Sequence, residues 1–291
     1  MSMSAFGNLW EHARLLSDAS RNAQMIELLR RRAPGARVLE VGCGTGLLSC
    51  VAARMGARHV IAVEPTEIIE YAYELVRANH LEHIVEVRRG LVQDFAPDPV
   101  DLAFSELLNA DPFAEGVLPA MDAAASWVAP GGMFSPQRLR VWAALVHVTS
   151  TAREVGQARA EVRALGAQHD LDVRGIMEDL AGMNCYRSVQ SNLKPISDPV
   201  LVYDLRLGRG ESPGTVEREL VVHEAGAVGG VVIWFEADLD EGLVLGNPPD
   251  ASGHWGQLCC AWVRERGVRA GEKVRIRVRT RPDGVVVDRL G

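Results

Sequence analysis

The sequence predicts an α/β domain with a parallel sheet, followed by an antiparallel β region. Strand-like apolar runs alternate with helical stretches from residue 37 to 147, a pattern typical of parallel sheets with helices on both faces. A charged helical stretch rich in Ala, Arg and Glu follows at residues 151–181. From residue 200 onward, short β-prone runs are separated by Gly, Pro and Asp turns, which favours an antiparallel sheet or barrel.

The periodicity places the individual elements. Expected strands of the parallel sheet are residues 37–41, 59–63, 84–88, 100–104 and 139–147. Expected helices are residues 11–32, 47–55, 66–79 and 115–127. Expected strands of the later region are residues 200–203, 219–223, 230–237, 257–264 and 273–279.

Three segments follow from this pattern. Residues 1–36 form an N-terminal helical segment, which Pro34-Gly35 ends. Residues 37–147 form the α/β domain, and residues 148–291 form a β-barrel-like domain that includes the helical arm at about 151–181.

Composition limits the classes of partner. The chain has 291 residues, of which 47% are hydrophobic, so it can bury a sizeable core. Its net charge of −7 argues against a nucleic-acid partner, because phosphate binding needs a basic surface. The same charge is compatible with a cationic substrate.

The cysteines and the absence of long apolar runs point to the cytoplasm. None of the five cysteines forms a C-x-x-C pair, so we expect neither a metal site nor a disulfide framework. Free thiols suit a reducing compartment. The N-terminus has no basic stretch followed by an apolar run, and no apolar stretch approaches 18 residues, so we expect no signal peptide and no membrane span.

The stretch VLEVGCGTGLL, residues 38–48, predicts a strand, a glycine turn and the start of a helix. Its glycines let the backbone turn sharply and approach a ligand, and the helix presents free N–H groups. They are Gly42, Gly44 and Gly46. The next strand ends in Glu64, roughly 20 residues past the first glycine, where an acid reaches ribose hydroxyls in a βαβ site. The pattern predicts nucleoside binding, with a purely structural turn as the alternative.

Two glutamates follow the fourth expected strand. Glu106 ends that strand, and Glu115 comes after a loop that contains Pro112. A hairpin-like loop could bring both carboxylates into one pocket, where they would repel unless a cation joined them. A guanidinium suits that role because it is planar and permanently charged and bonds carboxylates in paired fashion. Taken alone, either glutamate also fits a surface position, and Glu115 fits the first turn of a helix.

Four local motifs together resemble the catalytic core of the protein arginine methyltransferases (PRMTs). HARLLSDASRN, starting at His12, resembles the family's H-x-x-M-L-x-D-x-x-R helix, and GHWGQ, starting at Gly253, resembles its T-H-W loop. The glycine turn and the double-glutamate loop are the other two. The turn, with Glu40 just before it, is similar to that of class I S-adenosylmethionine (SAM) methyltransferases rather than to the dinucleotide fingerprint. The stretch EGVLP, starting at Glu115, resembles the branch that mostly makes monomethylarginine.

The resemblance implies how SAM is bound. Arg21 would bind the carboxylate of SAM, the three glycines would pass beneath it, and Glu64 would hold the ribose. Val92 and Gln93 would border the adenine, although the family more often has Glu at the latter position.

The resemblance also implies the substrate site. Glu106 and Glu115 would clamp the guanidinium and localise its charge away from the attacking nitrogen. His254 would pair with Asp18, and Trp255 would wall the pocket. Either Glu115 or the His254–Asp18 pair could accept the proton that leaves.

Three positions depart from the family pattern. The usual Y-F-x-x-Y helix has no counterpart before His12, Gly253 replaces the threonine of T-H-W, and Leu15 replaces the methionine of the first helix. By the same resemblance, residues 151–181 are a dimerisation arm, which predicts a homodimer of the usual closed twofold kind.

The substrate is predicted from composition and length. Many Ala, Arg, Gly and Val and few Lys suit a GC-rich bacterial genome, and the chain is about one catalytic core long. We therefore expect methylation of free L-arginine to Nω-methyl-L-arginine in a biosynthetic pathway. The alternatives are a protein or peptide arginine and, from another class, a non-catalytic SAM-binding scaffold.

Overall fold

The structure is a computed structural model. It describes residues 9–147, 150–177, 185–251, 253–281 and 284–290. The chain separates into two compact units, each assembled from several segments. The α/β unit comprises residues 1–140, 204–212 and 236–246, and the β unit comprises residues 141–203, 213–235 and 247–291. The predicted boundaries after residues 36 and 147 stay predictions.

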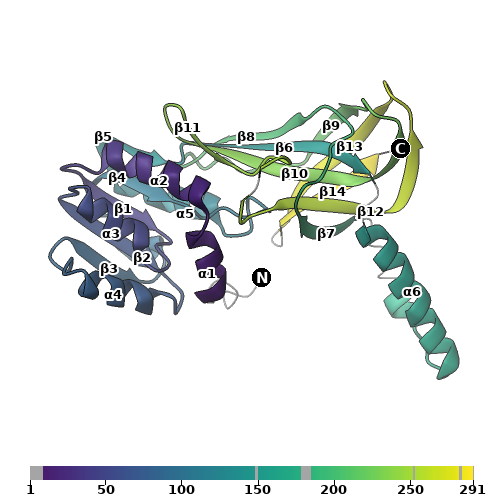
Figure 1. Cartoon of the computed structure of the whole chain (residues 1–291), viewed down its shortest axis with the longest axis horizontal. Helices are drawn as coiled ribbons and strands as arrows, with labels where there is room; N and C mark the ends of the chain where they lie inside the picture. The colour runs from purple at the N-terminus through teal and green to yellow at the C-terminus, as the bar shows by residue number, and fades with distance from the viewer. Residues whose placement is uncertain (1–8, 148–149, 178–184, 252, 282–283, 291) are drawn as a thin grey trace. The chain divides into compact units, whose positions relative to one another are not determined.

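A five-stranded parallel sheet forms the centre of the α/β unit (Figure 1). Its strands are β1 (Arg37–Val41), β2 (His59–Glu64), β3 (Val85–Arg89), β4 (Val100–Ser105) and β5 (Val128–Ser135). They lie in the order β3-β2-β1-β4-β5, and every neighbouring pair is parallel. Strands of such sheets are buried on both faces, which is why β1 and β2 read as apolar runs. The predicted α/β fold is confirmed.

Helices surround this sheet (Figure 1). They are α1 (Leu9–Leu16), α2 (Ala19–Arg32), α3 (Leu47–Arg54), α4 (Ile69–Ala78) and α5 (Val117–Ala124), with short 3-10 helices η2 (Val92–Asp94) and η3 (Ala125–Trp127). α3 packs against both α2 and α4, whereas α5 packs against η2 and η3.

The expected helix over residues 11–32 is divided in two. Asp18 lies between α1 and α2 in an extended conformation, and its side-chain oxygen accepts a hydrogen bond from the backbone N–H of Arg21 at 2.9 Å. Asp is a preferred N-cap because its carboxylate satisfies one of the N–H groups that a helix start leaves unpaired. The cap therefore starts a new helix and places Arg21 in its first turn.

The predicted fifth strand of the parallel sheet was wrong. Residues 139–147 belong to β6 (Arg138–His147), which lies in the antiparallel sheet, and the strand parallel to β4 is β5. β5 contains Pro130-Gly131-Gly132, which in sequence resembles a turn. The structure accommodates these residues through a register shift against β4, between Val100 and Leu102.

The remaining strands form antiparallel sheets, as predicted. β7 (Cys185–Gln190), β12 (Gln257–Val268), β10 (Gly226–Asp240), β6 and β8 (Val200–Arg206) lie in that order, with β11 (Leu243–Gly246) beside β10. A second sheet has the order β14 (Gly284–Leu290), β13 (Lys273–Arg281) and β9 (Val216–Val221). β10 pairs antiparallel with β11 and β12, and β13 does so with both of its neighbours. Strands β7, β11 and β14 were not expected from the sequence.

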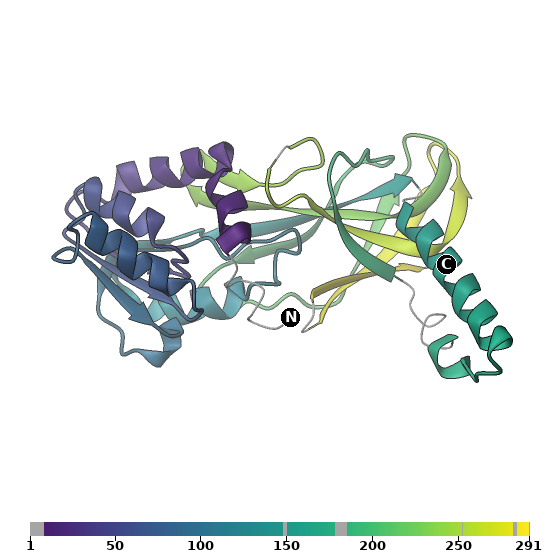
Figure 2. The same cartoon turned by 60° about the horizontal axis from the view of Figure 1, so that its bottom comes forward.

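One long helix, α6 (Ser150–Gln168), covers the first part of the predicted arm. It contacts β12 and β7 and then extends away from these strands (Figures 1 and 2). The end of the predicted arm, at residues 178–181, lies outside the described residues, and the dimerisation role of the arm stays a prediction. None of the helices in the described part of the chain is long and apolar enough to cross a membrane.

Candidate functional site

The glycine turn after β1 is too crowded for side chains. Its backbone is left-handed at Gly42 (φ 75°), Gly44 (φ 54°) and Gly46 (φ 75°), a conformation that glycine alone adopts readily. A Cβ on the first of these would lie 2.6 Å from Leu107, and one on the second 2.7 Å from His12. On the third it would lie 2.8 Å from Ala72 of α4. The turn directly before α3 therefore requires glycine at all three positions.

Glu64 joins the ends of β1 and β2. Its side chain is buried, and its Oε2 accepts a hydrogen bond from the backbone N–H of Gly44 at 3.0 Å. Its Oε1 accepts from the N–H and the hydroxyl of Thr66, at 2.9 and 2.6 Å. A carboxylate has about four acceptor positions, so Glu64 keeps room for a further hydroxyl donor. This arrangement suits the ribose role that the sequence predicts.

Glu40, at the end of β1, is also buried and accepts a hydrogen bond from the Ser49 hydroxyl of α3. Burial raises the pKa of Glu40 to about 8, although the Ser49 hydrogen bond and the nearby Arg21 oppose that rise. A carboxyl with such a pKa is largely protonated at neutral pH. Through this hydrogen bond, Glu40 links β1 to α3 on either side of the glycine turn.

A buried ion pair links α2 to the loop after β4. The Nε and Nη2 of Arg21 lie 2.6 and 2.5 Å from the same oxygen, Oε2, of Glu106. Both side chains are at most 5% exposed. Burial raises the pKa of Glu106, and Arg21 counteracts it. Removing one partner of a buried pair typically costs about 3–5 kcal/mol, so the two side chains fix each other.

The two predicted clamp glutamates influence each other in the structure. Burial, and then the charge of Glu106, raises the pKa of Glu115 to about 8. Asn109 donates a hydrogen bond to Oε1 of Glu115 at 2.8 Å. The other oxygen of Glu106, Oε1, is fully buried and has no hydrogen-bond partner within the described residues. A buried acceptor without a donor is costly unless a ligand supplies one.

Carboxylates outnumber cations in this part of the α/β unit. The pKa of Glu115 is raised by Glu106 and Glu64 and lowered by Arg21, and that of Glu40 is raised by Glu64 and lowered by Arg21. Arg21 thus lowers the pKa of three buried acids, Glu40, Glu106 and Glu115. A bound cation would lower the pKa of Glu40 and Glu115 further and favour their charged forms.

The predicted adenine neighbours differ in their surroundings. The side chain of Val92 is buried in a core cluster with Leu39 and Trp127. Gln93 is exposed. Only the backbone of Val92 and the side chain of Gln93 thus remain as groups that could meet a ligand.

In the β unit, His254 and Trp255 lie in the loop before β12. The ring of Trp255 is buried against the edge of Phe235, with 5.3 Å between ring centroids, and the His254 ring lies 4.3 Å away. Asn247 holds this loop: its Oδ1 accepts the N–H of Phe235 at 2.8 Å, and its Nδ2 donates to the carbonyl of Gly256 at 2.6 Å. The predicted pairing of His254 with Asp18 involves both units and stays a prediction.

Sequence reasoning did not find the neutral side chains that orient these acids. They are Ser49, Thr66 and Asn109. It also did not find Asn247, which holds the loop of His254 and Trp255. Of these, only Asn109 had a local signal, its place between the two glutamates.

Comparisons with known proteins agree with this geometry. A family model described as "Methyltransferase domain" matches residues 38–132. An "Arginine N(omega)-methyltransferase" of Streptomyces achromogenes subsp. streptozoticus is 28% identical over 276 residues, which cover 92% of this chain and 75% of that protein. "Protein arginine N-methyltransferase PRMT10" of Arabidopsis thaliana is 41% identical over 115 residues, which cover 38% of this chain and only 29% of that protein.

Solved structures share the fold. The Arabidopsis thaliana Protein Arginine Methyltransferase 10 structure has a TM-score of 0.83 at 23% identity and covers 95% of this chain and 89% of its own. The Trypanosoma brucei PRMT1 enzyme–prozyme heterotetrameric complex with AdoHcy has a TM-score of 0.81 at 20% identity and covers 99% of this chain and 95% of its own. These likenesses concern the fold.

The raised pKa of Glu115 predicts how stability depends on pH without ligand. The folded-state pKa of about 8 exceeds the ordinary value of 4.5. Between these values the unfolded chain loses a proton that the folded chain keeps, so this group lowers the free energy of unfolding as pH rises, by at most about 1.4 kcal/mol per pH unit. Relative to wild type, Glu115→Gln should become more stable from about pH 5 to about pH 8 in urea unfolding. A difference that stays constant over this pH range would contradict this.

Proposed function

We propose that this chain, a PRMT-like methyltransferase that uses SAM to methylate arginine, acts on free L-arginine and forms Nω-methyl-L-arginine. The observation that carries the proposal is the surplus of buried acids around the unpartnered Oε1 of Glu106. Such a surplus favours a cation that is also a rich hydrogen-bond donor, as a guanidinium is.

The free amino acid is supported by the breadth of one alignment. The Streptomyces relative aligns over 92% of this chain, and its name specifies arginine, whereas the plant protein named for protein arginine aligns over 38%. A protein or peptide arginine is the alternative.

The cofactor fits the residues around the glycine turn. SAM supplies a methyl group on a positively charged sulfur. Glu64, bonded to the glycine turn at Gly44, has acceptor capacity left for a ribose hydroxyl. Arg21 makes its side-chain bonds to Glu106 and Asn22 and has donors left for a carboxylate. Gln93 and the backbone of Val92 would border the adenine.

The two glutamates would act on the guanidinium. Oε1 of Glu106 and the second oxygen of Glu115 can each accept its N–H groups, while Arg21 and Asn109 hold the other oxygens. Asymmetric hydrogen bonding keeps positive charge on the nitrogens that do not react, so the attacking nitrogen recovers its lone pair. The same hydrogen bonds align the attacking nitrogen with the methyl group. Glu115, whose pKa is raised to about 8, is suited to accept the departing proton.

A test of the clamp removes one charge at a time. Glu106→Gln and Glu115→Gln keep shape but weaken the hold on the cation, and each should lower kcat for arginine by at least about 10²-fold. Glu115→Gln should change SAM affinity little in calorimetry, because the proposal assigns Glu115 to the guanidinium and not to SAM. Exposed Glu74→Gln is the control. Wild-type turnover in either clamp variant would remove that residue from the proposal.

A second test identifies the acceptor. kcat/KM should be higher for free L-arginine than for an arginine-glycine peptide, measured by release of the demethylated cofactor. A preference for the peptide of more than about tenfold, roughly 1.4 kcal/mol in transition-state binding, would overturn the free-arginine proposal. Bound SAM without turnover of either compound would favour the non-catalytic scaffold.

We also propose a homodimer formed through α6. The arm exposes Leu165 (55%), and Leu171 (62%) and Ile176 (56%) are exposed just after the helix. α1 exposes Trp10 (68%). Large exposed apolar side chains mark contact surfaces, and a closed twofold dimer through α6 and the segment after it would cover Leu165, Leu171 and Ile176.

Light scattering tests this assembly. The wild-type chain should have the mass of two chains, and Leu165→Asp should shift it toward one, because a charge would be buried in the interface. Val221→Asp, at an exposed position of β9, is the matched control and should stay dimeric. A monomeric wild type with full activity would contradict the proposal.

A cytoplasmic location also stays part of the proposal. Cys43 and Cys50 have free, buried thiols. Thiols in this state suit a reducing compartment.

A further inference from the structure

Helix α2 packs one face against the rest of the α/β unit. Met25 and Leu28 are completely buried on that face. Arg21 near its start and Arg32 at its end are eleven residues apart, which is about three turns of an α-helix, so the two arginines project from the same face. Met25 and Leu28 therefore lie between two guanidinium groups, of which that of Arg21 is buried and that of Arg32 is half-exposed.

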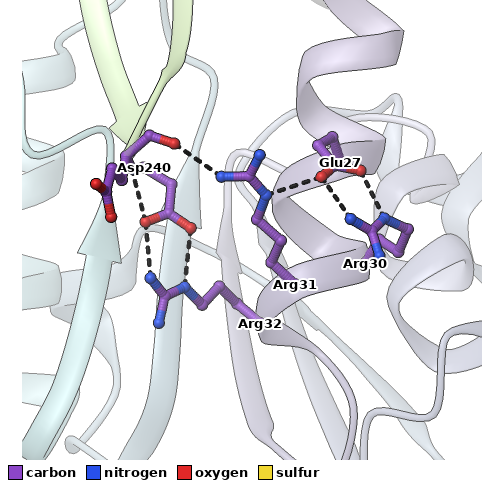
Figure 3. A network of polar contacts seen from close by, with 6 residues as sticks. Glu27, Arg30, Arg31, Arg32 and Asp240 are labelled. Atoms are coloured by element: carbon purple, nitrogen blue, oxygen red, sulfur yellow. Dashed lines mark hydrogen bonds and ion pairs between the residues drawn. The ribbon is translucent and has the colours of Figure 1, made fainter.

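The second of these guanidinium groups is held by a distant segment. Arg32 donates from Nε to Oδ2 of Asp240 at 2.9 Å and from Nη2 to Oδ1 at 2.7 Å (Figure 3). The Asp240 side chain is only 5% exposed. Paired N–H···O bonds of this kind fix direction as well as distance. Arg32 also lowers the pKa of Asp240, so the carboxylate is charged at neutral pH.

The neighbouring residues reinforce this contact. Arg31 donates from Nη1 to the carbonyl of Glu241 at 2.8 Å and from Nε to Glu27 at 2.8 Å (Figure 3). Glu27 also accepts two hydrogen bonds from Arg30. The last turn of α2 thus meets the turn between β10 and β11 at two adjacent residues.

The turn between β10 and β11 has an irregular backbone at Asp240. The register of β10 and β11 shifts between Asp238 and Asp240, which marks a bulge. Oδ1 of Asp240 also accepts the backbone N–H of Glu241 at 2.9 Å. The backbone of the turn therefore helps to orient the carboxylate of Asp240 toward Arg32.

We propose that Asp240 is a positioning residue for the cofactor site: through Arg32 it fixes α2 along its axis and so fixes where Arg21 meets Glu106. At the other end of the helix, both nitrogens of Arg21 bond a single oxygen of Glu106, a contact that permits pivoting. The forked pair at Arg32 removes that freedom. A displacement of about 1 Å in a catalytic group can cost about 10²-fold in rate.

The experiment is a double-mutant cycle read out by SAM binding in calorimetry. Asp240→Asn keeps shape but removes the charge that holds Arg32, and it should weaken SAM binding about three- to tenfold. In an Arg21→Lys background, Asp240→Asn should have little further effect on SAM affinity. The contact through which the position of α2 affects SAM is already changed in that background. Arg32→Lys, which keeps the charge but loses the fork, should behave as Asp240→Asn does.

Asp204→Asn is the matched control. Asp204 forms a forked pair with Arg138, between β8 and β6, with both bonds at 2.5 Å. Its loss should leave SAM affinity unchanged even if the melting temperature falls. The proposal is overturned if Asp240→Asn and Arg32→Lys lower the melting temperature without changing SAM affinity, or if their effects simply add to that of Arg21→Lys. If Asp240→Asn does not fold, Arg32→Lys decides alone. The readout needs SAM binding but no methyl acceptor, so it is independent of whether free arginine is the substrate.

Discussion

The α/β unit is governed by an imbalance of buried charge. Burial raises the pKa of the acids Glu40, Glu106 and Glu115, and Arg21 lowers the pKa of all three. Such an arrangement costs stability, and proteins keep it mainly at functional sites. It also defines what completes the site. A sulfonium and a guanidinium are both cations, so both substrates of the proposed reaction would bring the charge that the folded chain lacks.

The position of these acids follows from topology. β1, β2 and β4 are parallel, so their carboxyl ends meet at one edge of the sheet, and ligands bind such sheets at that edge. Glu64 and Glu106 could therefore be predicted from strand ends alone. The PRMT resemblance, which the comparisons confirm, added the reason for two glutamates in one loop. It did not show that Asn109 fixes one of them, although Asn109 lies between the two glutamates in the sequence.

The strands were predictable from the sequence where burial of apolar side chains alone determined their position. Buried parallel strands are apolar runs, and β1 to β4 begin and end within about two residues of the expected positions. β5 was missed because its Pro130-Gly131-Gly132 is a local turn signal that pairing with β4 overrides. The division of the first helix was missed for the opposite reason: the apolar spacing continues across Asp18, but its carboxylate satisfies an N–H better as a cap than within a helix.

The contact between Arg32 and Asp240 shows a deeper limit, because it joins residues 208 positions apart. The α/β unit includes residues 236–246. The segment that holds the end of α2 therefore comes far after the glycine turn in the sequence. Contacts of such separation form only after the loop-closure entropy between them has been overcome. The glycine turn and Glu64 belong to neighbouring strands, whereas α2, which carries Arg21, also contacts β11 near the end of the α/β unit's sequence. Cofactor geometry in this chain is thus a property of the complete fold and not of the sheet that contains the recognisable motif.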